Sequence, residues 1–111
     1  MVDSARKKEL VREYADRKQT PGVFAVRADG HVWTGTSRNL VTAQNGIWFA
    51  LRTGGYTNKE AQAAWNTHGE AAFTYEVLEE IADDNPQMVG LLLKEREAHW
   101  RDQLAAKKIA G

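Results

Sequence analysis

The sequence predicts an α+β domain: a small sheet, antiparallel at its hairpin, with helices packed on it in the order α-β-β-α-α-β-α. In residues 22–35, side chains alternate between two strand faces on either side of a central Asp-Gly turn. In residues 73–77, apolar and polar side chains alternate again. Segments with helical periodicity surround both. At 111 residues with 42% apolar side chains, we expect a single domain over 1–111.

The first element expected is a helix over residues 3–19, whose apolar side chains share one helical stripe. It ends near Thr20-Pro21-Gly22. Residues 22–27 then read as a strand, Ala28-Asp29-Gly30 as a turn with a glycine for positive φ, and residues 31–35 as the returning strand. This predicts a short β-hairpin.

Two helices are expected after the hairpin. Asn39 is a suitable N-cap for a helix over residues 40–52. Thr57 and Glu60 have the three-residue spacing of a reciprocal capping box, which opens a second helix. Glycines follow both segments and are expected to end them.

The last two elements are a strand and a long helix. Phe73, Tyr75 and Val77 alternate with polar residues, which predicts a third strand of about seven residues. Asn85 followed by Pro86 is a favourable N-cap and first-turn pair, so a helix is expected from there to about residue 107.

Composition limits the function classes. The 15 basic and 15 acidic residues cancel, which argues against binding nucleic acid through overall basicity alone. Residues 21–59 are mainly basic and residues 70–84 mainly acidic, so a basic and an acidic face are expected. No cysteine, signal peptide or membrane-length apolar run is present, so we expect a cytoplasmic protein that does not bind membranes.

Two tripeptides have a characteristic spacing: Gly22-Val23-Phe24 and, nine residues after Phe24, Trp33-Thr34-Gly35. Together with the later helices and strand, over about residues 20–104, this pattern resembles a bacterial stand-alone branch of the GIY-YIG nucleases. The resemblance implies a three-stranded antiparallel sheet flanked by helices. It also implies cleavage of nucleic-acid phosphodiesters, DNA in preference to RNA, with one magnesium or manganese ion.

Glu97 is the metal-ligand candidate. It lies on one helical stripe with Leu93, Trp100 and Leu104, and a glutamate on a core-facing stripe is costly unless paired or ligated. A carboxylate oxygen is a hard ligand that suits magnesium. The alternative is a glutamate that bends to solvent or pairs with Arg101.

The resemblance also marks two aromatic positions. Phe24 and Trp33 stand where the family has tyrosines, and they are the remaining catalytic candidates beside Glu97 and two arginines. Phe24 has no hydroxyl, and an indole donates a hydrogen bond but cannot accept a proton as a base. Core packing explains both equally well.

The arginine expected from the family would stand near Ala43 or Gly46, and neither can counter a phosphate charge. Arg38 before that helix and Arg52 at its end are the substitutes; the alternative for each is a surface arginine. The late asparagine of the family has no counterpart in residues 105–111.

Three functions remain open from the sequence. The first is a metal-dependent endonuclease, and the second is a nucleic-acid-binding module that no longer cleaves. The third is a protein-interaction module, with a homodimer among its forms, that exposes an apolar patch near Trp48 or Trp65. A nuclease should bring Glu97 and Arg38 or Arg52 into one cleft at the Gly35 end of the hairpin.

Overall fold

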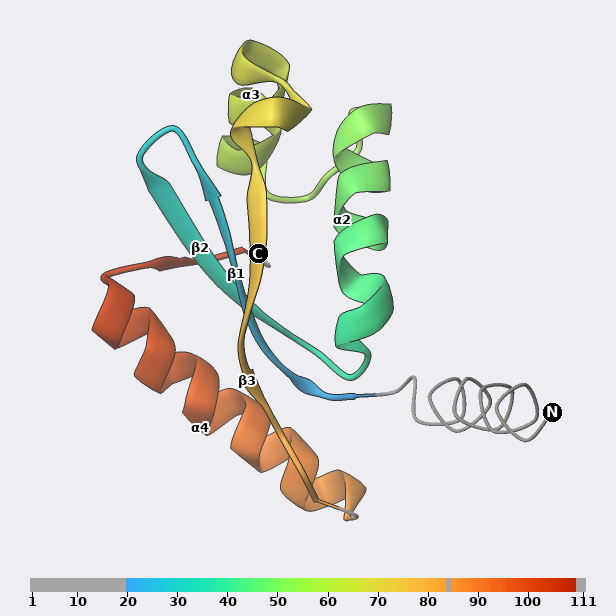
Figure 1. Ribbon diagram of the computed structural model, residues 1–111, viewed down its shortest axis with the longest axis vertical. Coiled ribbons are helices and arrows are strands. Elements are labelled where there is room, and N and C mark those ends of the chain that lie inside the picture. Colours follow the sequence, from blue (N-terminus) through green and yellow to red (C-terminus); the bar gives the residue numbers. More distant parts are fainter. Residues whose placement is uncertain (1–19, 84, 110–111) are drawn as a thin grey trace, which may run out of the picture.

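The computed structural model describes residues 20–83 and 85–109, and the helix expected over residues 3–19 lies outside this part. The described elements follow the expected order from the hairpin onward (Figure 1). They are β1 (Gly22–Ala28), β2 (His31–Ser37), α2 (Leu40–Thr53), α3 (Lys59–His68), the 3-10 helix η1 (Glu70–Ala72), β3 (Thr74–Glu80), α4 (Pro86–Leu104) and β4 (Lys107–Lys108).

The sheet has the strand order β3-β1-β2-β4. Strand β1 pairs antiparallel with both β2 and β3, which confirms the expected α+β class with a small antiparallel sheet. The prediction of three strands was incomplete, because β4 pairs with β2 in parallel. The last helix ends at Leu104 instead of about residue 107, since Ala105 adopts a left-handed conformation with φ 51° and turns the chain back to β2.

The hairpin is tighter than expected. Ala28 pairs with His31, which leaves only Asp29 and Gly30 in the turn. Both have positive φ, 48° and 81°, as a two-residue hairpin turn of the mirror-image class requires. Asp-Gly is a favoured pair for this geometry, so the local sequence explains the turn.

Two of the three helix starts are as expected. The Asn39 side chain accepts from the backbone N–H of Val41, and Asn85 caps α4 with Pro86 in the first turn. The capping-box prediction for α3 was wrong, because the N-cap is Asn58. Its amide oxygen accepts from Ala61 N at 3.0 Å while its nitrogen donates to two carbonyl oxygens, those of Lys108 and Ile109. A threonine hydroxyl has only one hydrogen to donate.

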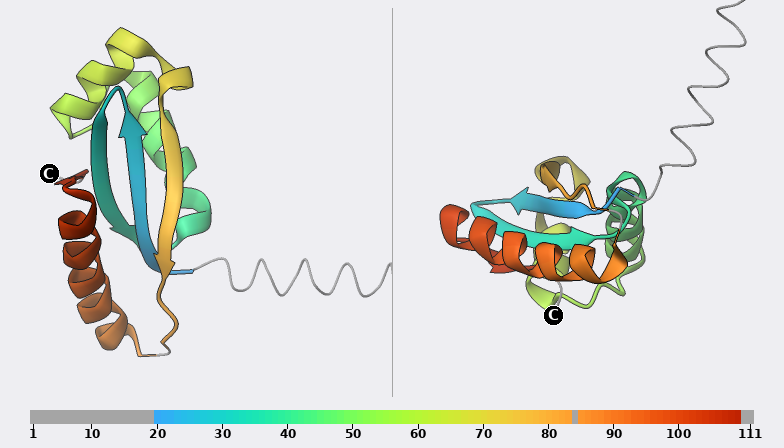
Figure 2. Two further views of the ribbon diagram at one scale, coloured as in Figure 1. Left: turned by 60° about the vertical axis from the view of Figure 1, so that its left-hand side comes forward. Right: turned by 90° about the horizontal axis from the view of Figure 1, so that it is seen from below.

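Helices cover both faces of the sheet (Figure 2). Helix α4 lies on one face, where Ile81, Val89 and Leu93 form a small apolar cluster. Helices α2 and α3 lie on the other face, over the main core. That core is formed by Phe24, Val26, Ala28, Trp33, Leu40, Trp48, Leu51, Ala61, Ala64, Phe73 and Ile109.

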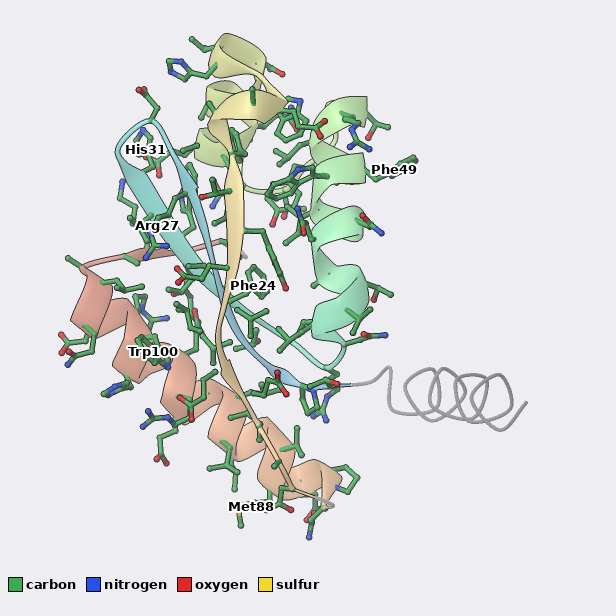
Figure 3. The ribbon with its side chains drawn as sticks, in the orientation of Figure 1. Phe24, Arg27, His31, Phe49, Met88 and Trp100 are labelled. Carbon is green, nitrogen blue, oxygen red and sulfur yellow. The ribbon has the colours of Figure 1, made fainter. Side chains whose placement is uncertain are left out.

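The middle helices keep their tryptophans inside. Trp48 is buried, and Trp65 packs partly buried against the main core. Instead, Phe49 is the most exposed large apolar residue of α2, with 65% of its surface exposed (Figure 3).

The expected separation into a basic and an acidic face is not found. Arg27 forms an ion pair with Glu76 across the sheet, and Arg52 pairs with Glu70 at 3.1 Å. The basic and acidic segments therefore neutralise each other in part. Among the described helices, none has the length and apolar character to cross a membrane.

Candidate functional site

A two-part pocket opens beside β2, at the end of that strand left uncovered by β4. We call its two parts the apolar lobe, of about 410 Å³, and the basic lobe, of about 440 Å³. Both lobes are lined by Thr36, Ser37, Glu97 and Lys108, so they adjoin each other. The Gly35 end of the hairpin lies in the apolar lobe.

Glu97 stands where the lobes meet. Its residue surface is only 8% exposed, and its Oε2 accepts hydrogen bonds from Thr34 Oγ1 at 3.3 Å and Arg101 Nη1 at 3.0 Å. Oε1 accepts no hydrogen bond from any residue that the structure describes. The pairing with Arg101 that the sequence left open as the alternative is therefore present, and it occupies one carboxylate oxygen while the other remains for a ligand.

The basic lobe adds three cations, from Arg38, Lys94 and Lys108. None of them forms an ion pair within residues 20–83 and 85–109, whereas Arg27, Arg52, Arg96, Arg101 and Lys107 all do. Unpaired cations around one concave surface make a favourable potential for an anion.

Arg38 reaches α4 from the loop after β2. A Cβ added to Gly90 would lie 3.3 Å from Arg38 Nη2, so the guanidinium rests against the helix at this glycine. Gly90, Lys94 and Glu97 are spaced by four and three residues, which places them on one stripe of α4. The arginine, the lysine and the carboxylate therefore face the same lobe.

The floor of the apolar lobe is the ring of Phe24 with Ile109. Both lie over Gly35, where any Cβ would come within 2.6 Å of each of them. The wall comes from α2 through Ala43, Gly46 and Ile47, and from Tyr56 after that helix; all four line the lobe.

Tyr56 supplies the phenol of the apolar lobe. Burial raises the pKa of Tyr56 above its ordinary value of 10.0, so the hydroxyl stays protonated at neutral pH. It can donate a hydrogen bond to a ligand but is a poor proton acceptor.

Strand β4 completes both lobes. Lys108 pairs with Thr34 in the sheet, and Ile109 N donates to Thr34 O at 2.8 Å. From α3, the Asn58 amide donates to the carbonyl oxygens of Lys108 and Ile109 at 3.2 and 3.0 Å. This short strand brings one cation and one floor residue to the pocket.

Three of the candidates from the sequence come together here. Phe24 lines the apolar lobe, Arg38 the basic lobe and Glu97 both. Trp33 and Arg52 line neither lobe.

The other two candidates have structural partners elsewhere. Trp33 is fully buried, stacks on His31 and Phe73, and donates from Nε1 to Glu60 at 3.0 Å. Arg52 forms two hydrogen bonds with Glu70, at 3.1 and 3.3 Å.

Sequence reasoning missed Tyr56, Lys94 and Lys108. Lys94 had a detectable signal, because it lies three residues before Glu97 on a predicted helix and therefore on the same side. Lys108 had none, because it was expected just beyond a helix and reaches the pocket through a two-residue parallel strand. Tyr56 follows two glycines in a loop whose path no periodicity predicts.

This arrangement of sheet and helices is the fold of GIY-YIG nuclease domains, as the motif spacing indicated. Two solved structures share it: a mutant of the catalytic domain of the intron endonuclease I-TevI, and the catalytic domain of the homing endonuclease I-TevI. The first has a TM-score of 0.68 and 22% identity, and covers 82% of this chain and 94% of that one. The second has a TM-score of 0.67 and 24% identity, and covers 82% of this chain and 99% of that one.

At such identities the likeness establishes the fold. The sequence matches no protein-family model and no curated protein.

Proposed function

We propose that this chain is a metal-dependent endonuclease that hydrolyses phosphodiester bonds of nucleic acid, DNA in preference to RNA, in the two-part pocket. One observation carries the proposal. A nearly buried carboxylate, Glu97, has one oxygen left for a ligand and faces three unpaired cations in a single depression. The shared fold with endonuclease catalytic domains supports the same reading.

The basic lobe suits a phosphate of the backbone. Arg38 presents a planar guanidinium that can bind two phosphate oxygens, and Lys94 and Lys108 supply charges on either side. A fully cationic pocket would bind phosphate without changing it. Glu97 adds a carboxylate oxygen that can bind a metal ion, which a purely cationic phosphate site lacks.

The donor set fits a magnesium or manganese ion bound together with substrate. No group of three or more acidic or histidine side chains that could hold a metal occurs among the described residues, so Glu97 would be the single protein ligand. Magnesium commonly keeps several waters and binds through one or two carboxylates plus substrate phosphate oxygens. When bound, such an ion supplies positive charge to the phosphoryl and leaving oxygens.

Protein groups would orient the reacting atoms. Arg101 and Thr34 hold Oε2 of Glu97, which leaves Oε1 as the oxygen that would bind the ion. Tyr56, whose pKa burial raises further above 10.0, is protonated at neutral pH and would donate to a water or a phosphate oxygen. Phe24 offers no hydroxyl, and its part is to exclude water from the floor.

A nucleic-acid-binding module without cleavage is the second candidate. It is favoured by the position of Ala43 and Gly46, which line the apolar lobe where the resemblance places an arginine. No histidine lines either lobe in the described part of the chain, so Glu97, already assigned to the metal, is the only carboxylate there that could accept a proton.

Cleavage assays separate the two candidates. Labelled single-stranded, duplex and branched DNA would be incubated with magnesium or manganese and either the wild-type protein, Glu97→Gln or Glu95→Gln. Glu95→Gln is a matched control, because it removes an exposed carboxylate of the same helix outside both lobes. Metal-dependent cutting that is lost only in Glu97→Gln supports the endonuclease; binding without cutting in all three proteins leaves the binding module.

A further inference from the structure

The apolar lobe is an unexplained part of the site. A phosphate and a metal ion are polar, yet this lobe of about 410 Å³ is lined by Phe24, Ile47 and Ile109. Phosphate binding alone requires no such surface. An apolar space that opens beside a phosphate site calls for a second, less polar group of the same ligand.

Small residues keep the lobe open. Ala43 and Gly46 stand on consecutive turns of α2, and a Cβ added to Gly46 would meet no heavy atom within 4 Å. Space that a side chain could fill without a clash is thus left free. A ligand can use this volume without displacing protein atoms.

The lobe also has the surface chemistry of a base-binding site. Tyr56 contributes a half-buried aromatic ring, and aromatic rings stack on nucleobases of any identity. Thr36 and Ser37 add hydroxyls at the junction with the basic lobe, where polar edges of a base can be satisfied.

The position of the two lobes beside each other determines what kind of base could enter the apolar lobe. In nucleic acid the groups next to a phosphate are its sugar and base, and both lobes share Glu97 and Lys108. A paired base stays stacked inside the duplex, whereas an unpaired or flipped base can leave the stack and enter a pocket.

We propose that the apolar lobe binds one unpaired nucleobase next to the phosphate held by the basic lobe, so that the substrate is single-stranded or locally unpaired nucleic acid. This inference rests on the proposed function, since it takes the basic lobe as the phosphate site. The ring of Tyr56 would contact the base, and Gly46 would leave room for it.

Binding measured without metal tests the inference under conditions in which metal-dependent cleavage cannot occur. Fluorescence anisotropy in EDTA would compare three labelled probes of equal length: single-stranded oligothymidylate, the same strand made of abasic sugar-phosphate units, and a duplex. We expect wild-type protein to bind oligothymidylate roughly 10-fold more tightly than the abasic strand, the size typical of one stacked base.

Two variants change the lobe in opposite ways. Gly46→Leu fills it and replaces a glycine inside a helix by a better helix former, so folding should not suffer. Tyr56→Leu removes the ring. Both should lower oligothymidylate affinity to that of each variant's own abasic-strand binding, and Gly46→Leu should leave abasic binding unchanged. Gln44→Leu, on an exposed position of α2 outside both lobes, is the matched control.

The outcomes test the base pocket separately from the proposed phosphate site. Equal affinity for base-containing and abasic strands, or full base-dependent binding in both lobe variants, overturns the base pocket while the phosphate site stands. Failure to bind any of the three probes overturns the phosphate site and the inference together. Tighter binding of the duplex than of oligothymidylate also overturns the base pocket.

Discussion

Thr34 and Glu97 join the sheet to α4 through a buried hydrogen bond, with Oγ1 of the threonine 3.3 Å from Oε2 of the glutamate. Thr34 is fully buried in β2, at the position that pairs with Lys108 of β4. The same residue thus orients the carboxylate and aligns the strand that completes the pocket.

We predict that Thr34→Val weakens both the fold and the site. The change keeps the shape but removes the donor to Glu97, which should cost about 1 kcal/mol in the free energy of unfolding measured with urea. If the endonuclease proposal holds, cleavage should fall roughly 10-fold, as for other groups that orient a metal ligand. The control is Thr67→Val, at an exposed position of α3 without a side-chain hydrogen bond in the described part of the chain, which should alter neither.

The basic lobe predicts how binding depends on salt. Removing Arg38, Lys94 and Lys108 together by alanine substitution should make the plot of log affinity against log salt shallower by about 2 for single-stranded DNA, since each neutralised phosphate contributes about 0.7. Lys59→Ala is the control, because Lys59 also forms no ion pair in the described part of the chain but lies outside both lobes. An unchanged slope in the triple variant would place the phosphate contacts elsewhere.

Glu97→Gln should act in opposite directions on binding and cleavage. Without metal, loss of the negative charge should tighten DNA binding about 2- to 5-fold, which corresponds to roughly 0.4 to 1 kcal/mol in the free energy of binding. Anisotropy titrations in EDTA measure this, with Glu95→Gln as the charge-matched control. Weaker metal-free binding by Glu97→Gln alone would mean that the carboxylate serves only to fix the pocket's shape.

Acid should destabilise the contact between α3 and β4. Hydrogen bonds from Lys107 and Trp33 lower the pKa of Glu60 below its ordinary value of 4.5. A lowered pKa in the folded state stabilises the fold above the unfolded value, and this stabilisation is lost as pH falls from about 4.5 through the folded pKa.

Urea unfolding between pH 7 and pH 3 measures this loss, which should be smaller in Glu60→Gln than in wild-type protein. Part of the loss should remain, because Glu79 contributes too. Burial acts to raise the pKa of Glu79, but hydrogen bonds from Trp100 and Arg96 leave it lowered. An identical pH profile in Glu60→Gln would contradict the prediction.

The fold was predictable because its signals are local. Asp29-Gly30 determines the hairpin, Asn39 and Asn85 begin helices as caps, and alternation around Tyr75 marks the third strand. Strand β4 was not predictable, since Lys107 and Lys108 carry no strand pattern and are extended only because they pair with Trp33 and Thr34.

The site was predictable only in part. Glu97 and Arg38 could be found because a carboxylate on an apolar helical stripe and the family spacing both draw attention. Trp33 shows what the motif cannot predict. Its position gives no information on its hydrogen-bond partner, Glu60, which lies 27 residues away. Glu60 had instead been assigned to a capping box, which the structure does not have. Pairings between distant side chains depend on the final packing.

Strand β4 gives the pocket a lower local stability than the domain as a whole. Two paired residues, one backbone bond from Ile109, two hydrogen bonds from the Asn58 amide and the Lys107–Glu60 ion pair hold it, and Ile109 adds its contacts with the main core. Strand β1, in contrast, is bonded to neighbours along both of its edges over most of its length. Local opening of so few bonds costs much less than global unfolding. Amide hydrogens of residues 107–109 should therefore exchange with solvent well before those of β1, and a fully folded domain can exist with its pocket unassembled.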